Sequence, residues 1–308
     1  MTEAIVLSLP DDAAFGQALA GALGVEHGEL LWRHFPDGES HIALPESLAG
    51  RRVVINCTLA RPDPKLAPLL FVADAARDFG ATQVGLVAPY LAYMRQDRRF
   101  HAGEAVTSRT FARVLSSAFD WLATVDPHLH RYASLDEIYA IPSRVVHAAP
   151  LLGCWIAENV GNPLILGPDA ESEQWVSEVA AGIDAPYAVF TKTRLGDRQV
   201  RIDPPDLSRY AGRQPVLVDD IVSSGRTLIE AARLLDIAGF AKPVCAVTHA
   251  LFSQNAHADL TRSVASIVSS DTVPHPTNAI SVVQELGFAV QSLQSSESSL
   301  STGGRDHA

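Results

Sequence analysis

Two adjacent aspartates stand at the end of an apolar run in the stretch VLVDDIVSSGRTL, residues 216–228. A strand, a tight small-residue loop and a helix start gather backbone N–H groups and the positive end of the helix around one point, which favours a phosphate. Asp219 and Asp220 would repel a bare phosphate, but carboxylates accept hydrogen bonds from sugar hydroxyls or hold Mg²⁺ through water. The stretch therefore predicts a site for a sugar phosphate.

The predicted phosphate loop comprises Ser223, Ser224, Gly225, Arg226 and Thr227. Its hydroxyl groups add donors, and the small residues let the backbone approach a ligand closely. The alternative is that the two aspartates only end a strand and cap a turn. The loop is not a Walker A motif, because no GxxxxGK[ST] occurs in the chain, and ordinary P-loop phosphoryl transfer is thereby excluded.

Two further segments combine positive charge with an apolar run before them. In PYLAYMRQDRRF (89–100), guanidinium groups are concentrated in an otherwise acidic protein, and their forked donors suit phosphate oxygens. In FTKTRLGDRQVRI (190–202), Lys192 and Arg194 precede a glycine and could close over a reacting phosphate to stabilise developing charge. A solvated basic face remains the alternative for both segments.

The elements that must hold these residues are short apolar runs alternating with amphipathic stretches. Several of the runs lack polar alternation, which is typical of strands covered on both faces in a parallel sheet. The helical stretches between them end at glycines, for example Gly80 and Gly239. This alternation predicts an α/β fold. The apolar runs are 53–56, 84–90, 122–128, 164–169, 187–192, 216–220 and 244–250.

The alternating pattern occurs twice, which predicts two similar α/β domains in tandem. We expect each to be a mainly parallel sheet flanked by helices, the first over 1–144 and the second over 145–293. Residues 294–308 are rich in Ser and Gly and offer little to bury, so they are expected to be disordered.

Composition narrows the class of partner and the compartment. The net charge of −11 argues against nucleic-acid binding, which normally needs a basic surface. Cys57, Cys154 and Cys245 are widely separated and odd in number, which favours reduced thiols. No apolar run reaches bilayer-spanning length, and the N-terminus lacks the pattern of a signal peptide. We therefore expect a cytoplasmic protein that binds neither nucleic acid nor membrane.

The stretch DDIVSSGRTL resembles the phosphoribosyl pyrophosphate (PRPP) loop of type I phosphoribosyltransferases and of ribose-phosphate pyrophosphokinases, and its form is closer to archaeal-type members of the second family. Other segments of that family have counterparts here in the same order along most of the chain. The resemblance implies two tandem domains of type I phosphoribosyltransferase fold. The counterparts are HFPDGESHIAL (34–44), PYLAYMRQDRRF (89–100), the strand end Asp126–His128, LGPDAESEQWV (166–176), FTKTRLGDRQVRI (190–202) and SDTVPHPTNAISVV (270–283).

The resemblance also implies roles for individual residues. Phe35, Asp37 and Glu39 would contact the adenine of ATP across a subunit interface, although a simple hairpin turn is the alternative. Arg95, Gln96 and Asp97 would bind the nucleotide, the first two through its phosphates. His128 and Asp169 would bind Mg²⁺, although a buried structural histidine is an alternative for His128, because this cation prefers oxygen. Thr107 and Ser108 are expected to cap the helix that follows.

The implied reaction transfers the β,γ-pyrophosphoryl group of ATP to the C1 hydroxyl of ribose 5-phosphate, giving PRPP and AMP, with Mg²⁺ as cofactor. Lys192 and Arg194 would stabilise the transition state, and a homo-oligomer, a dimer or a hexamer, is expected. Two alternatives remain: a phosphoribosyltransferase that consumes PRPP, and a catalytically silent regulatory member of the family. The second is motivated by Glu171 and Ser172, which stand where the family commonly has glycine.

Overall fold

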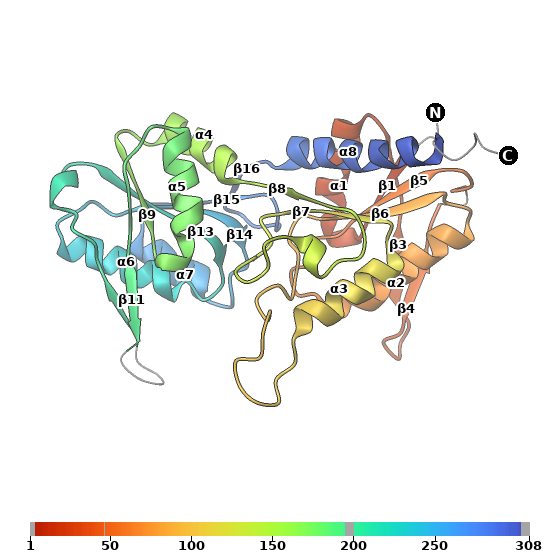
Figure 1. The fold of residues 1–308 in the computed structure, drawn as a ribbon, viewed down its shortest axis with the longest axis horizontal. Coiled ribbons are helices and arrows are strands. Elements are labelled where there is room, and N and C mark those ends of the chain that lie inside the picture. Colours follow the sequence, from red (N-terminus) through yellow and green to blue (C-terminus); the bar gives the residue numbers. More distant parts are fainter. Residues whose placement is uncertain (1–3, 46, 195–199, 303–308) are drawn as a thin grey trace. The chain divides into compact units, whose positions relative to one another are not determined.

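The chain folds into two compact units, each built around a six-stranded parallel sheet (Figure 1). The computed structural model describes residues 4–45, 47–194 and 200–302 of the 308, and the side chains at 192–194, 200–202 and 296–302 lie outside that description. Unit 1 contains the chain up to Val146 together with the segment from Val283 onward, and unit 2 is His147–Val282.

The sheet of unit 1 has the strand order β2-β1-β5-β6-β7-β8, and every pairing in it is parallel. Its central strands are buried from end to end because helices cover both faces, which explains why their sequences lack polar alternation. The strands are β1 (Ala4–Ser8), β2 (Glu26–Gly28), β5 (Arg52–Asn56), β6 (Gln83–Ala88), β7 (Trp121–Val125) and β8 (Ser143–Val146).

Helices cover the two faces of this sheet in pairs. α1 (Ala13–Leu23) and α8 (Val283–Thr302) lie side by side on one face, and α2 (Asp63–Asp78) and α3 (Thr107–Ala118) lie on the other (Figure 1). Short 3₁₀ helices stand at Pro10–Asp12 (η1) and Leu135–Glu137 (η2).

A glycine makes room for the largest side chain in the unit 1 core. Trp121 of β7 is only 1% exposed, and a Cβ atom at Gly85 of β6 would lie 1.9 Å from its indole ring. Because β6 and β7 pair with Gly85 opposite Trp121, the ring lies over the neighbouring strand. A small residue at position 85 is therefore required by the packing of adjacent strands.

Unit 2 repeats this architecture with the strand order β10-β9-β13-β14-β15-β16, again all parallel. α4 (Ala149–Asn159) and α5 (Glu173–Gly182) lie on one face, and α6 (Arg226–Ile237) and α7 (Ala256–Ser263) lie on the other (Figure 1). The strands are β9 (Pro163–Gly167), β10 (Tyr187–Val189), β13 (Gln214–Val222), β14 (Val244–Ala250), β15 (Ser266–Ser270) and β16 (Asn278–Ile280), with 3₁₀ helices η3 (Ala170–Ser172) and η4 (Ser208–Tyr210).

Each unit also carries a two-stranded antiparallel ribbon apart from its main sheet. β3 (Leu31–His34) pairs with β4 (Ser40–Ala43) in unit 1, and β11 (Thr191–Arg194) pairs with β12 (Val200–Asp203) in unit 2. In both units the ribbon follows the edge strand and precedes the central strand, β5 or β13. The expected α/β fold class and the repetition of element order are confirmed, and the ribbon is inserted at the same place in both units.

The helix ends follow the glycines that the sequence indicated. α2 ends at Asp78 and α6 at Ile237, and two residues later Gly80 and Gly239 adopt positive φ values of 86° and 81°. The N–H groups of these glycines donate to the carbonyl oxygens of Arg77 at 2.9 Å and Asp236 at 3.0 Å, so they satisfy groups that the helices leave without a partner.

The C-terminal helix alters the domain limits expected from the sequence. Leu286, Val290 and Leu293 of α8 are buried, and α8 packs on α1, β7 and β8 of unit 1. The segment 283–293, which the sequence assigned to the second domain, therefore belongs to the first. The helix continues to Thr302, through part of the 294–308 tail that was expected to be disordered.

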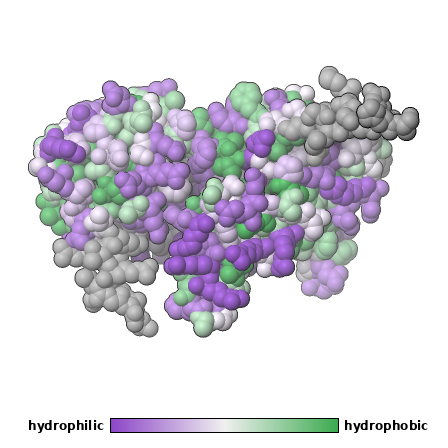
Figure 2. Space-filling model, in the orientation of Figure 1, coloured by the Kyte–Doolittle hydropathy of each residue, from purple (hydrophilic) through white to green (hydrophobic). Residues whose placement is uncertain are grey.

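The visible surface is mostly hydrophilic, with apolar residues scattered across it (Figure 2). In the part of the chain that the structure describes, no helix combines the length and the apolar character that a bilayer crossing requires.

Candidate functional site

The carboxyl ends of β9 and β13 bring three aspartates together in unit 2. Leu217 of β13 pairs with Leu166 of β9, so Asp219 and Asp169 follow the paired residues at the same edge of the sheet. Strand β13 continues to Val222, so Asp219 and Asp220 lie within the strand and not in the loop after it. The doublet therefore has the rigid support of a central strand.

These three carboxyl groups interact electrostatically. The pKa of Asp219 is raised well above its ordinary value, first because burial removes the carboxyl from water and then because Asp220 and Asp169 add negative charge. Asp220 is itself 7% exposed, and its Oδ1 accepts the N–H of Ile221 at 2.7 Å. The Asp219 carboxyl thus lies against like charge from two neighbouring carboxyl groups.

The predicted phosphate loop links β13 to α6 beside these aspartates. Gly225 is the N-cap residue of α6 with φ of 67°, and as a glycine it has no side chain to bond the first N–H groups of the helix. Ser223 and Ser224 precede it, and Thr227 lies in the first turn. Because the first N–H groups of a helix have no partner within the helix, this end can accept an anion.

The loop is fixed in place by the segment that follows β14. The N–H of Leu251 donates to the carbonyl of Val222 at 2.9 Å, and the N–H of Ser253 donates to that of Ser223 at 3.1 Å. On the other side, Leu228 of α6 is buried in the core of unit 2. Both flanks are therefore anchored, which favours a preformed loop.

The turn after β9 accounts for the departure from glycine noted in the sequence. Asp169 caps η3, and its Oδ1 accepts the N–H of Glu171 at 3.1 Å. The Oγ of buried Ser172 donates to the carbonyl of Asp169 at 2.6 Å and fills the space beside Gly167. The Glu171 side chain is exposed. Ser172 thus holds the turn that orients Asp169.

The proposed catalytic cations belong to the β11–β12 ribbon. Lys192 pairs with Ile202, and Arg194 pairs with Val200, across its backbone register. Their side chains, and residues 195–199 between the strands, lie outside the described residues.

The predicted adenine residues occupy the tip of the β3–β4 ribbon in unit 1. The N–H of Phe35 donates to Glu39 at 2.8 Å, the N–H of Glu39 donates to Asp37 Oδ1 at 3.2 Å, and Gly38 has φ of 92°. These contacts form a hairpin turn, which was the alternative to an adenine-binding role in the sequence analysis. It also leaves the Phe35 ring 41% exposed, with the Arg33 guanidinium 5.0 Å from its centroid.

The three residues of the RQD segment, Arg95, Gln96 and Asp97, lie in different environments. Arg95 is exposed, whereas Gln96 accepts the Thr107 hydroxyl at 3.0 Å. Asp97 is 6% exposed, and it accepts Arg131 Nη1 at 2.8 and 2.9 Å. Arg131 was not among the residues that the sequence indicated.

The expected helix caps were wrong, because Thr107 and Ser108 already lie within the first turn of α3 and Val106 precedes it. Their hydroxyl groups instead contact Gln96 and Tyr132. Thr107 bonds Gln96, and the Ser108 Oγ lies 3.0 Å from the Tyr132 hydroxyl. A capping pattern considers only neighbouring residues, so it could not indicate that these hydroxyls bond partners distant in the sequence.

The predicted metal ligands are divided between the units, with His128 in unit 1 and Asp169 in unit 2. His128 is half-buried, and its ring centroid lies 3.9 Å from that of His130. Among the described residues, no three His, Cys, Asp or Glu side chains form a ready cation cage. Mg²⁺ usually takes one or two carboxylates and completes its shell with water and substrate phosphates, so the aspartate edge of unit 2 fits this ion better than an imidazole does.

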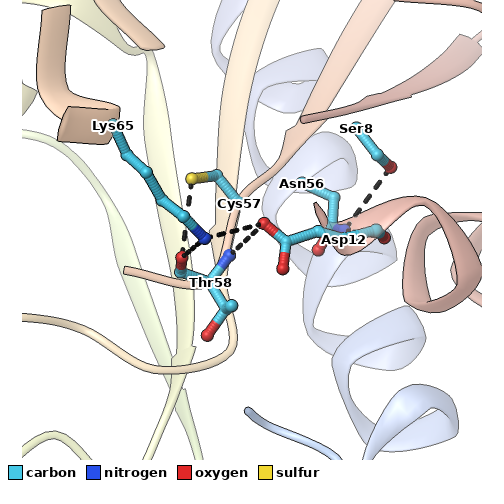
Figure 3. A network of polar contacts seen from close by, with 6 residues as sticks. All are labelled: Ser8, Asp12, Asn56, Cys57, Thr58 and Lys65. Carbon is cyan, nitrogen blue, oxygen red and sulfur yellow. Dashed lines mark hydrogen bonds and ion pairs between the residues drawn. The ribbon is translucent and has the colours of Figure 1, made fainter. Parts of the chain in front are cut away.

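Unit 1 has a polar network at the ends of β1 and β5, the counterparts of β9 and β13 (Figure 3). Lys65 of α2 lies 3.5 Å from Asp12 Oδ2 and donates to the Thr58 carbonyl at 2.9 Å. Asp12 also accepts the Thr58 N–H at 3.1 Å, and Asn56 donates to the Asp12 carbonyl at 3.1 Å. At this edge of unit 1, a buried lysine and a buried aspartate therefore contact each other and the backbone of Thr58.

Asp12 should make stability depend on pH. Burial raises its pKa to about 6 from an ordinary value of 3.8, although Lys65 opposes the shift. The folded state therefore holds more protons than the unfolded state between these values, and stability falls as pH rises through this window. Relative to Asp12→Asn, the wild-type free energy of unfolding should fall by about 2 kcal/mol from about pH 4 to about pH 6.

Urea denaturation of both proteins at several pH values measures this difference. Asp11→Asn is the matched control, because Asp11 is exposed and adjacent. If wild-type and Asp12→Asn proteins show the same pH slope, the Asp12 carboxyl does not titrate in this window.

Two tandem domains with the same sheet order, one carrying an acid doublet before a small-residue loop and a helix start, define a protein of the phosphoribosyltransferase class. Family models agree. The N-terminal domain of ribose phosphate pyrophosphokinase matches residues 4–118, and the phosphoribosyl transferase domain matches residues 134–285. The chain belongs to the ribose-phosphate pyrophosphokinase family.

Individual relatives support this membership over nearly the whole chain. The Methanopyrus kandleri ribose-phosphate pyrophosphokinase is 38% identical over 94% of this chain and 99% of its own length. The Halobacterium salinarum protein of the same name is 31% identical over 93% and 100%. A crystal structure of phosphoribosylpyrophosphate synthetase from Mycobacterium smegmatis has the same fold, with a TM-score of 0.83 at 22% identity over 96% of this chain and 100% of that chain. The predicted family, archaeal-like form and fold are confirmed.

Proposed function

We propose that this chain transfers the β,γ-pyrophosphoryl group of ATP to the C1 hydroxyl of ribose 5-phosphate. The sugar oxygen forms a bond to the β-phosphorus, the bond from that phosphorus to the oxygen it shares with the α-phosphorus breaks, AMP leaves, and the hydroxyl proton is released. The observation that carries the proposal is the edge of unit 2, where a phosphate loop adjoins an acid doublet on a rigid strand. Pyrophosphoryl transfer needs alignment and charge neutralisation more than covalent catalysis.

In this proposal the sugar phosphate binds unit 2. The loop from Ser223 to Thr227 holds the 5-phosphate, and Asp219 and Asp220 accept hydrogen bonds from the ribose hydroxyls. Lys192 and Arg194 stabilise the charge that develops on the phosphates during transfer.

The nucleotide binds unit 1, where Arg95 and Gln96 bind its phosphates and Phe35, Asp37 and Glu39 contact the base. Mg²⁺, when bound, would neutralise phosphate charge. Asp169 is the preferred protein ligand, and His128 is the second candidate.

Two properties beyond the reaction belong to the same proposal. A cytoplasmic location is supported by Cys57, Cys154 and Cys245, which are all free thiols. A homo-oligomer, a dimer or a hexamer, is supported by the family resemblance and by the exposed Phe35 ribbon, which would contact adenine across a subunit interface. Light scattering of the purified protein tests the oligomeric state.

The activity is tested by incubating the purified chain with ATP, ribose 5-phosphate and Mg²⁺ and measuring AMP and PRPP by ³¹P NMR or chromatography. We expect AMP and PRPP in equal amounts, and neither product when EDTA removes the metal. Pyrophosphate release that requires a nucleobase and PRPP would instead indicate a phosphoribosyltransferase. Binding of both substrates without AMP formation would indicate a catalytically silent family member.

A further inference from the structure

Asp97 and Arg131 form an ion pair that joins two separate segments of unit 1. The Asp97 side chain is 2% exposed, and both of its oxygens accept Nη1 of Arg131, at 2.8 and 2.9 Å. The Arg131 side chain is 41% exposed and approaches the site from the segment after β7. A buried carboxylate that is committed to a protein cation is poorly placed to bind an anionic nucleotide directly.

A second contact ties the same two segments through their neighbours. The hydroxyl of buried Tyr132 donates to the Asp97 carbonyl at 3.2 Å and lies 3.0 Å from the Ser108 Oγ. The N–H of Ser108 in turn donates to the Gln96 carbonyl at 3.4 Å. The RQD segment is therefore held from both sides, by the start of α3 and by Arg131–Tyr132.

The guanidinium of Arg131 also lies above the Phe100 ring, 5.7 Å from its centroid, and Arg98 lies 5.0 Å from the same centroid. Phe100 is 48% exposed. Arg131, which neutralises Asp97, thus also contacts Phe100 at the end of the segment 89–100. In the sequence, Arg131 stands three residues after His128. The Arg131 side chain thus connects the segment 97–100 to the stretch of chain that follows His128.

We propose that Arg131 is a positioning residue of the nucleotide site. It neutralises Asp97 and thereby holds Arg95 and Gln96 in a fixed position relative to the segment that carries His128. This inference rests on the proposed function for the assignment of the nucleotide to unit 1. It changes the role expected for Asp97 from nucleotide ligand to anchor of the residues before it.

The test compares Arg131→Gln, Arg131→Lys and the double variant Arg131→Gln/Asp97→Asn with the wild type. Arg131→Gln should raise KM for ATP about tenfold or more and leave KM for ribose 5-phosphate within about twofold, because the sugar site lies in unit 2. Arg131→Lys should restore part of the ATP affinity, since a lysine can still neutralise Asp97. The double variant should be more thermally stable than Arg131→Gln, since it removes the buried charge of Asp97. Its ATP affinity should stay low, because the Asp97–Arg131 ion pair is not restored.

Arg77→Gln is the matched control, because Arg77 forms an ion pair with Asp120 elsewhere in unit 1, with contacts of 2.9 and 3.2 Å. That variant should leave both KM values unchanged. If Arg131→Gln lowers the melting temperature without changing KM for ATP, or raises both KM values equally, Arg131 has only a structural role and the inference is overturned.

Calorimetric binding of Mg·ATP separates this inference from the proposed function. A wild-type chain that makes no AMP but binds Mg·ATP, with weaker binding in Arg131→Gln, would overturn the reaction and support the positioning role. A wild-type chain that binds no nucleotide would overturn both.

Discussion

Replacing Asp219 and Asp220 together with asparagine should lower kcat/KM for ribose 5-phosphate by about 10²-fold or more and should raise the thermal stability of the protein. Each ionised carboxylate that accepts a sugar hydroxyl contributes about 1.5–3 kcal/mol, so the loss of both charges gives an effect of this size. Asparagine keeps an amide oxygen for the N–H groups of Asp220 and Ile221, which the two carboxylates now accept at 3.1 and 2.7 Å. The fold should therefore survive the change.

The gain in stability follows from the same geometry. The pKa of Asp219 is raised by burial and by the charges of Asp220 and Asp169, so ionisation of the Asp219 carboxyl destabilises the folded state. Because the folded pKa lies above the ordinary value, this destabilisation appears as pH rises through the window between the two values, and the variant should lack it. Sites that retain such like charge commonly do so for function at the expense of stability.

Asp236→Asn provides the control, since Asp236 is an exposed acid near the end of α6 in the same unit. It should alter neither kcat/KM nor, beyond about 0.5 kcal/mol, stability. Steady-state kinetics and thermal denaturation at pH 5 and pH 8 measure both quantities. An Asp219→Asn/Asp220→Asn protein that keeps its activity, or that melts earlier than the wild type at pH 8, would contradict the role given to the doublet.

Replacing Lys192 with alanine should lower kcat by about 10²–10³-fold, the usual cost of losing one donor that stabilises transition-state charge. The dissociation constant for ribose 5-phosphate should change by no more than about threefold, because an interaction made mainly in the transition state contributes little to ground-state binding. Single-turnover kinetics and calorimetry on the same preparation measure the two effects.

Lys242→Ala is the matched control. Lys242 precedes β14, at the amino edge of the unit 2 sheet, and its Nζ donates to the Arg262 carbonyl at 2.9 Å. That edge is opposite to the one at which parallel strands of this kind place their ligands. Equal losses in turnover and in binding for Lys192→Ala would show that Lys192 binds substrate and does not act chiefly in the transition state.

Local patterns were sufficient for the parts of this protein that contiguous residues encode. Apolar runs without alternation predicted the buried parallel strands, and Gly80 and Gly239 marked the helix ends, because strand burial and left-handed turns depend on a few neighbouring residues. The acid doublet and its loop were also readable, since a strand, a turn and a helix start in one stretch place them together. The order of the matched segments along the chain was sufficient to predict the family.

Partners distant in sequence were decided only by the tertiary structure. Asp97 meets Arg131 from a position 34 residues away, and Asp12 meets Lys65 through the pairing of β1 with β5. Thr107 and Ser108 fit a capping pattern, yet their hydroxyls bond Gln96 and Tyr132. The helix α8 belongs to unit 1 because Leu286, Val290 and Leu293 are buried on it, which no neighbouring residue indicates. Sequence periodicity records which face of an element is buried, whereas the sheet order determines what that face is buried against.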